Sequence, residues 1–147
     1  GFIKSPVGNV YSDRFVLLAI LSQINFLLYC VDQWIKDEIP TKLRLGYLLY
    51  FSLLNVNEQI NTKLGITFKI DTSWKSDRFR NAMAHYKLGI VLKENELISG
   101  DAMFGLTRKL FGEDYLIVKK SIYKELKGLA KQIGEYLELP QRMVYLQ

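Results

Sequence analysis

Apolar residues recur at spacings of three and four along most of this chain, the pattern of helices that each bury one face. The clearest row lies in the last helix, which is predicted over residues 113–139. That row consists of Ile122, Leu126, Leu129, Ile133 and Leu137. The carboxyl end is therefore expected to be one helix packed along one side.

The first helix is predicted from an N-cap at Ser12 or Asp13 to about Asp37, ahead of the break at Pro40. Its apolar segment, Phe15–Val31, comes near the short limit for crossing a bilayer. Because three polar residues interrupt this segment, we expect a core helix buried on most sides and no membrane partner.

The second helix is predicted from a cap at Thr41 to about Lys63. Gly65 is well placed as its C-terminal stop, since helices commonly end on a glycine in the left-handed conformation. A short connector, 66–70, follows it.

The third helix is predicted over 73–87, with a cap supplied by residues 71–73. Residues 88–99 are expected to form a loop or small hairpin, and 101–111 a short helix ended by Gly112. Together these elements predict an all-α fold, an antiparallel bundle of four to five helices.

Composition agrees with a single folded domain over 1–147. Of the 147 residues, 49% are hydrophobic and 24% are charged, which is enough apolar material for a core. The single cysteine, Cys30, permits no intrachain disulfide, and a reducing, cytoplasmic location is the simplest expectation.

The formal charge of +5 is concentrated in one segment. Residues 69–93 contain six basic and two acidic side chains, and they surround the one histidine, His85. A clustered positive charge of this kind favours an anionic partner such as RNA.

A helical wheel divides the third helix into two faces. Its core side carries Phe79, Ala82, Met83 and Tyr86. On the other side Asp77, Asn81 and His85 form a line at spacings of four, so consecutive members can touch. Arg78 and Arg80 also lie in this polar half.

The motif Arg80-Asn81-x-x-x-His85, on a helix of a small bundle, resembles the signature of the HEPN superfamily. The resemblance implies a metal-independent endoribonuclease without a cofactor, whose active site forms where two copies of the motif meet. It also implies a role in toxin–antitoxin pairs or antiviral defence, with an antitoxin or regulatory protein as a candidate partner. One toxin branch carries a tyrosine where this chain has Lys87, so that branch's regulation is not carried over.

The residue types suit this chemistry. A histidine with a pKa near 6.5 can take or give a proton at neutral pH, and Arg80 can hold a phosphate through two hydrogen bonds. Asn81 can orient either the imidazole or the substrate. Because each chain has one histidine, a homodimer would supply the two needed for acid and base. Further RNA contacts are expected from Lys75, Arg78, Tyr86 and Lys87.

Plainer interpretations stand beside this one. His85 could be a structural residue bonded to Asn81 or Asp77, and the arginines could pair with Asp77 or simply be solvated. Trp74 could stack on a base or anchor a helix end. The whole face could belong to a non-catalytic module that binds RNA or a protein. A zinc site is not expected, because one cysteine and one histidine fall short of four ligands.

Overall fold

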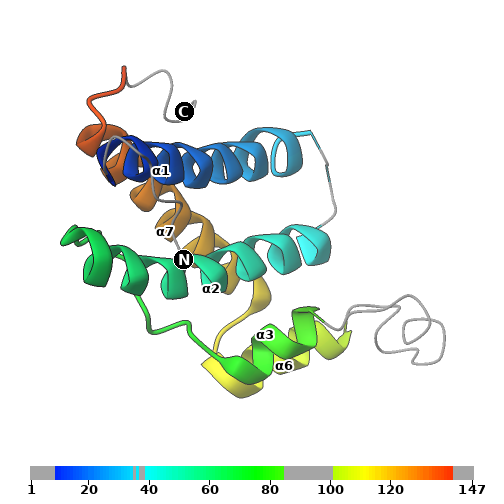
Figure 1. Ribbon diagram of the computed structural model, residues 1–147. Helices are drawn as coiled ribbons and strands as arrows, with labels where there is room; N and C mark the ends of the chain where they lie inside the picture. The colour runs from blue at the N-terminus through cyan, green and yellow to red at the C-terminus, as the bar shows by residue number, and fades with distance from the viewer. Residues whose placement is uncertain (1–8, 35, 37–38, 85–100, 141–147) are drawn as a thin grey trace.

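The computed structural model describes residues 9–34, 36, 39–84 and 101–140. Over these residues it contains five α-helices, one π-helical turn and no strand, which confirms the all-α fold (Figure 1). The elements are α1 (Asn9–Phe26), η1 (Leu27–Val31), α2 (Ile39–Leu64), α3 (Asp77–Ala84), α6 (Asp101–Phe111) and α7 (Tyr115–Tyr136). The loop or hairpin predicted over 88–99 lies outside the described residues.

The helices form a bundle in which α1 and α2 run antiparallel and α7 crosses behind them (Figure 1). Helix α7 packs against α1, α2 and α6, while α3 packs against α2 and α6. The apolar row predicted for the last helix is buried along its whole length, as expected. Asp114 caps this helix, since its Oδ1 accepts a hydrogen bond from the Leu116 N–H at 2.9 Å.

Both predicted glycine stops are confirmed. Gly65 and Gly112 have φ angles of +68° and +69°, which other residues rarely adopt. Their N–H groups donate to the carbonyls of Asn61 and Arg108 at 3.0 and 2.9 Å, closing the last turns of α2 and α6.

Two predicted N-caps are wrong. Helix α1 already includes Asn9, so Ser12 and Asp13 lie inside it. Helix α2 begins at Ile39 and takes Pro40 into its first turn, where the missing N–H of proline costs no hydrogen bond. The proline therefore opens the second helix rather than separating it from the first.

The first helical segment is shorter and more exposed than predicted. It ends with η1 at Val31, and a turn follows at residues 32–34. Asp13–Val31 is long and apolar enough to cross a membrane, a criterion that core helices of soluble proteins also meet. Only 39% of it is buried, because its helical neighbours cover one side.

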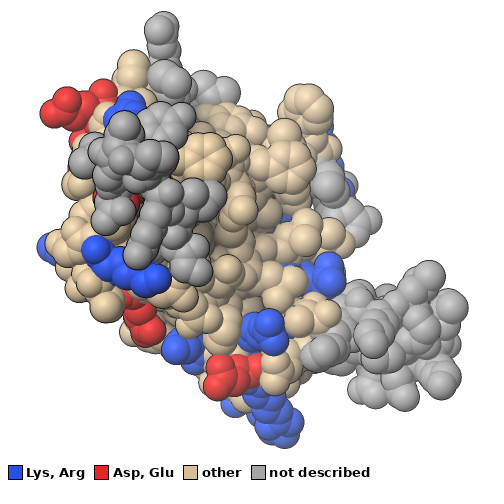
Figure 2. All heavy atoms as spheres, in the orientation of Figure 1, with Lys and Arg blue, Asp and Glu red and all other residues tan. Residues whose placement is uncertain are grey.

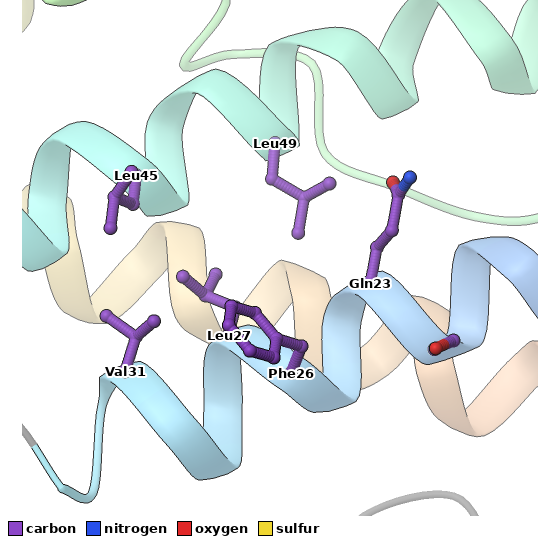
Figure 3. A pocket seen from close by; sticks show the side chains of 7 residues that line it. Gln23, Phe26, Leu27, Val31, Leu45 and Leu49 are labelled. Atoms are coloured by element: carbon purple, nitrogen blue, oxygen red, sulfur yellow. The ribbon is translucent and has the colours of Figure 1, made fainter.

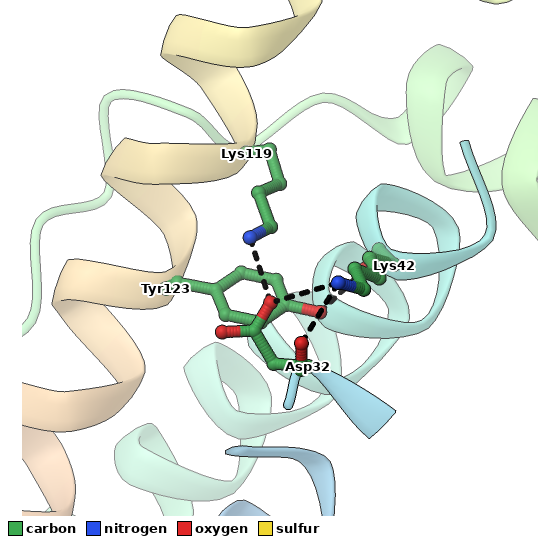
Figure 4. Close-up of polar contacts among 4 residues, drawn as sticks. All are labelled: Asp32, Lys42, Lys119 and Tyr123. Carbon is green, nitrogen blue, oxygen red and sulfur yellow. Dashed lines mark hydrogen bonds and ion pairs between the residues drawn. The ribbon is translucent and has the colours of Figure 1, made fainter. Parts of the chain in front are cut away.

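A polar cluster fastens the end of this segment to α2 and α7 (Figure 4). The Asp32 Oδ1 lies 2.8 Å from Lys119 Nζ and 3.7 Å from Lys42 Nζ. Lys42 also donates to the Asp32 carbonyl at 2.8 Å, and the Tyr123 hydroxyl donates to the Lys42 carbonyl at 2.8 Å. Four side chains from three parts of the chain therefore fix one corner of the bundle.

Candidate functional site

Helix α3, which carries the predicted site, is anchored by aromatic packing. Phe79 and Met83 are buried, as the wheel predicted. The Phe79 ring meets Tyr47 and Phe111 edge-on, with centroids 4.6 and 5.3 Å apart. Trp74 is half-buried and packs edge-on against Phe111 at 5.5 Å, so it anchors the start of α3.

The start of α3 is set by a tyrosine on α2. The Tyr47 hydroxyl donates to the Trp74 carbonyl at 2.7 Å and accepts from the Ser76 N–H at 2.9 Å. Ser76 Oγ then accepts from the Phe79 N–H at 3.1 Å, so the cap is Ser76 and not one of residues 71–73, as predicted. Burial raises the pKa of Tyr47 to about 12, so the hydroxyl remains a donor even in alkaline solution.

The far end of α3 is held by Arg44, a residue that the sequence analysis missed. Its Nε donates to the Met83 carbonyl at 2.8 Å and so satisfies one of the last carbonyls of the helix. The sequence did hold a signal for this role, because Arg44 is the one charged residue in the apolar run from Leu43 to Val56. His85, Tyr86 and Lys87 lie just beyond, outside the described residues.

The exposed side of α3 brings three predicted site residues together. Arg80 Nη1 donates to Asn81 Oδ1 at 3.1 Å. The Arg80 guanidinium carbon and the Lys75 Nζ lie 6.0 and 5.9 Å from the centroid of the same ring, Phe51. Both cations thus lie at the outer limit of cation–π range of one aromatic ring. Phe51 was also missed, although it lies seven residues after Arg44 and hence on the same side of α2.

Arg78 does not join this group. It is exposed, but a separation of two residues rotates it about 200° from Arg80, onto the other flank of α3. Within the described part of the chain, neither Arg78 nor Arg80 forms an ion pair with Asp77, although all three side chains are described. The interpretation in which Asp77 neutralises these arginines is therefore wrong.

The surface around α3 is consequently basic. Lys and Arg side chains lie along the lower part of the face in Figure 2, where α3 and α6 lie in Figure 1, with an acidic patch among them. No group of three or more His, Cys, Asp or Glu able to hold a metal occurs among the described residues. The described groups can bind and orient an anion, while proton transfer would fall to His85.

Comparison of the chain with family models, curated proteins and solved structures finds no match. The resemblance to the HEPN superfamily therefore rests on the Arg80-Asn81-x-x-x-His85 motif in the sequence and on an all-α fold in which Arg80 and Asn81 lie on α3.

Proposed function

We propose that this chain is an endoribonuclease of HEPN type, which cleaves RNA without a metal at a site made by two copies of the motif. The observation that carries the proposal is the state of Arg80. Its guanidinium is exposed, oriented by Asn81, and paired with no carboxylate of the described chain. A guanidinium in that state is free to donate two hydrogen bonds to the oxygens of a phosphate.

Each residue then has one role. The His85 imidazoles of the two chains act as base and acid, removing the 2′-hydroxyl proton and protonating the leaving 5′-oxygen. Arg80 stabilises the negative charge that builds up on the phosphate, and Asn81 positions the reacting groups. Lys75, Arg78, Tyr86 and Lys87 hold the flanking RNA. Attack by the 2′-oxygen leaves a 2′,3′-cyclic phosphate and a 5′-hydroxyl.

The decisive experiment is an RNA cleavage assay with EDTA present. Wild-type protein is expected to give 2′,3′-cyclic phosphate ends, and His85→Ala is expected to lower the rate by at least about 100-fold, the usual size of a general acid–base effect. Arg80→Ala should lower the rate comparably. Lys131→Ala, which removes an exposed charge from α7, serves as the matched control and should cleave normally.

A second candidate is a non-catalytic module that binds RNA through the same face. It is favoured by the placement of Lys75 and Arg80 over Phe51, since cations beside an aromatic ring suit single-stranded RNA. Such a module would bind RNA with a strong salt dependence and show no turnover. Equal cleavage by wild type and His85→Ala would exclude the catalytic assignment. Binding without cleavage would favour the module.

A further inference from the structure

The outer face of α1 carries a mainly apolar stripe that begins next to the exposed Arg14. Its exposed residues are Phe15, Leu18, Ala19, Ser22, Gln23 and Phe26. Phe15 is 57% exposed, Leu18 37% and Phe26 63%, and no charged residue occurs anywhere from 15 to 31. Single exposed apolar side chains are ordinary, but three large ones on one helix face, with only the short polar Ser22 and Gln23 between them, are typical of a contact surface.

The order of sizes along the stripe suits a second copy of the same helix. Helical spacing alone makes the exposed positions symmetric about the midpoint between Ile20 and Leu21, but it does not dictate which residues occupy them. Here a phenylalanine stands at each end, and small side chains, Ala19 and Ser22, stand near the centre. In an antiparallel pair, Phe15 would face Phe26 of the second copy, while the small residues would let the backbones approach.

A hollow beside the stripe supplies a place for the facing ring. It has a volume of about 430 Å³ and lies between the end of the α1–η1 segment and α2 (Figure 3). Phe26, Leu27 and Val31 project into it from one side and Leu45 and Leu49 from the other. Since Phe26 borders this hollow, the antiparallel register brings the phenylalanine at position 15 of the second copy to its mouth.

We infer that two copies of this chain pack antiparallel through α1, with Phe15 of each copy seated in the hollow of the other. Such a contact is isologous, because each residue pair occurs twice about one twofold axis. The inference is carried by α1 and its hollow, and it does not depend on the proposed cleavage activity.

The available area sets the strength of this dimer. An aromatic side chain buries roughly 150–250 Å² in full, so the two phenylalanines of each copy contribute roughly 200–300 Å². A standard interface buries about 800 Å² per partner. Even with the walls of the hollow added, a reversible dimer is therefore expected. Each copy carries a charge of +5, so salt should strengthen the dimer by screening their repulsion.

The test is sedimentation of the full chain over a wide concentration range. Wild type should pass from monomer to dimer. Ala19→Arg, which places two charges near the axis, should weaken the dimer at least about tenfold, since an unpaired charge is costly to desolvate. Gln59→Arg adds the same charge at an exposed position on α2 and should dimerise normally. Phe15→Gln provides a second disruption if Ala19→Arg loses helical circular dichroism.

Cysteine pairing fixes the register, in a Cys30→Ser background. A mixture of Ala19→Cys and Ser22→Cys chains should form a disulfide between positions 19 and 22. Phe15→Cys should not pair with itself, because antiparallel packing separates the two copies of position 15 by about 16 Å along the axis. A 15–15 disulfide would overturn the antiparallel register. A wild-type monomer at every concentration would overturn the inference, as would binding to phosphatidylcholine vesicles without a dimer.

Discussion

At the scale of single residues, Gly46 of α2 lies directly against the ring of Tyr123 on α7. A Cβ at position 46 would come within 3.2 Å of the Tyr123 Cδ1 and Cζ and closer still to Cε1. The ring has little freedom to retreat, because its hydroxyl is bonded to the Lys42 carbonyl and its side chain is buried. The glycine therefore sets how closely α2 and α7 approach.

Gly46→Ala is accordingly expected to lower the free energy of unfolding by about 1–3 kcal/mol, as overpacking does. The matched control is Gly128→Ala on α7, where a Cβ meets nothing within 4 Å. There the gain in helix propensity should raise stability by about 0.5–1 kcal/mol. Urea unfolding measures both. If Gly46→Ala proved as stable as Gly128→Ala, the contact between position 46 and the Tyr123 ring would not limit how closely α2 and α7 approach.

At the scale of elements, the polar cluster around Asp32 fixes the end of the first helical segment to α2 and α7. Asp32 bonds to Lys119 of α7 through its carboxylate and to Lys42 of α2 through its carbonyl. Lys42 is only 9% exposed, so its charge has little access to water. Asp32 thus holds two lysines from different helices, and its carboxylate also lies 3.7 Å from Lys42 Nζ.

Asp32→Asn should lower the free energy of unfolding by about 1–2 kcal/mol, because a charge-assisted hydrogen bond is lost from a half-buried place. A double-mutant cycle that combines Asp32→Asn with Lys119→Met gives the interaction free energy between Asp32 and Lys119. The exposed Arg108–Asp114 pair is the comparison, with Arg108 68% exposed. Arg108→Ala should cost less than about 1 kcal/mol, as surface pairs do. Equal losses of unfolding free energy at the Asp32–Lys119 and Arg108–Asp114 pairs would argue against a special role for Asp32.

At the scale of the whole molecule, the chain presents two different surfaces on opposite sides of α2. The apolar stripe lies on α1, and the basic group lies on α3 (Figure 1). Each proposal requires a second copy of the chain, but at a different surface. Used together, two isologous contacts would join more than two chains.

This separation predicts that Ala19→Arg keeps its RNA cleavage within about twofold of wild type, because α1 pairing does not bring the α3 helices together. Cleavage and sedimentation are measured on the same preparation, with Gln59→Arg beside it. Loss of cleavage together with loss of the dimer would show that the α1 contact does assemble the active site. Loss of the dimer with normal cleavage would leave both proposals standing.

The sequence by itself determined most of what is local. It predicted the helical class, the stops at Gly65 and Gly112, the buried row of α7, and the outward position of Arg78, Arg80 and Asn81 on α3. These follow from the helical repeat and from backbone conformations that only some residues adopt, so neighbours along the chain suffice to fix them.

Only the tertiary structure decided what depends on residues far apart in sequence. The Tyr47 hydroxyl bonds to the Ser76 N–H at the start of α3, three residues after the last predicted cap. Lys75 and Arg80 both lie beside the ring of Phe51, which comes from α2. One-sided packing of α1 left a stripe exposed in a segment whose composition alone predicts burial. Periodicity shows which side of a helix is apolar, but only the arrangement of the other helices determines which apolar residues are covered.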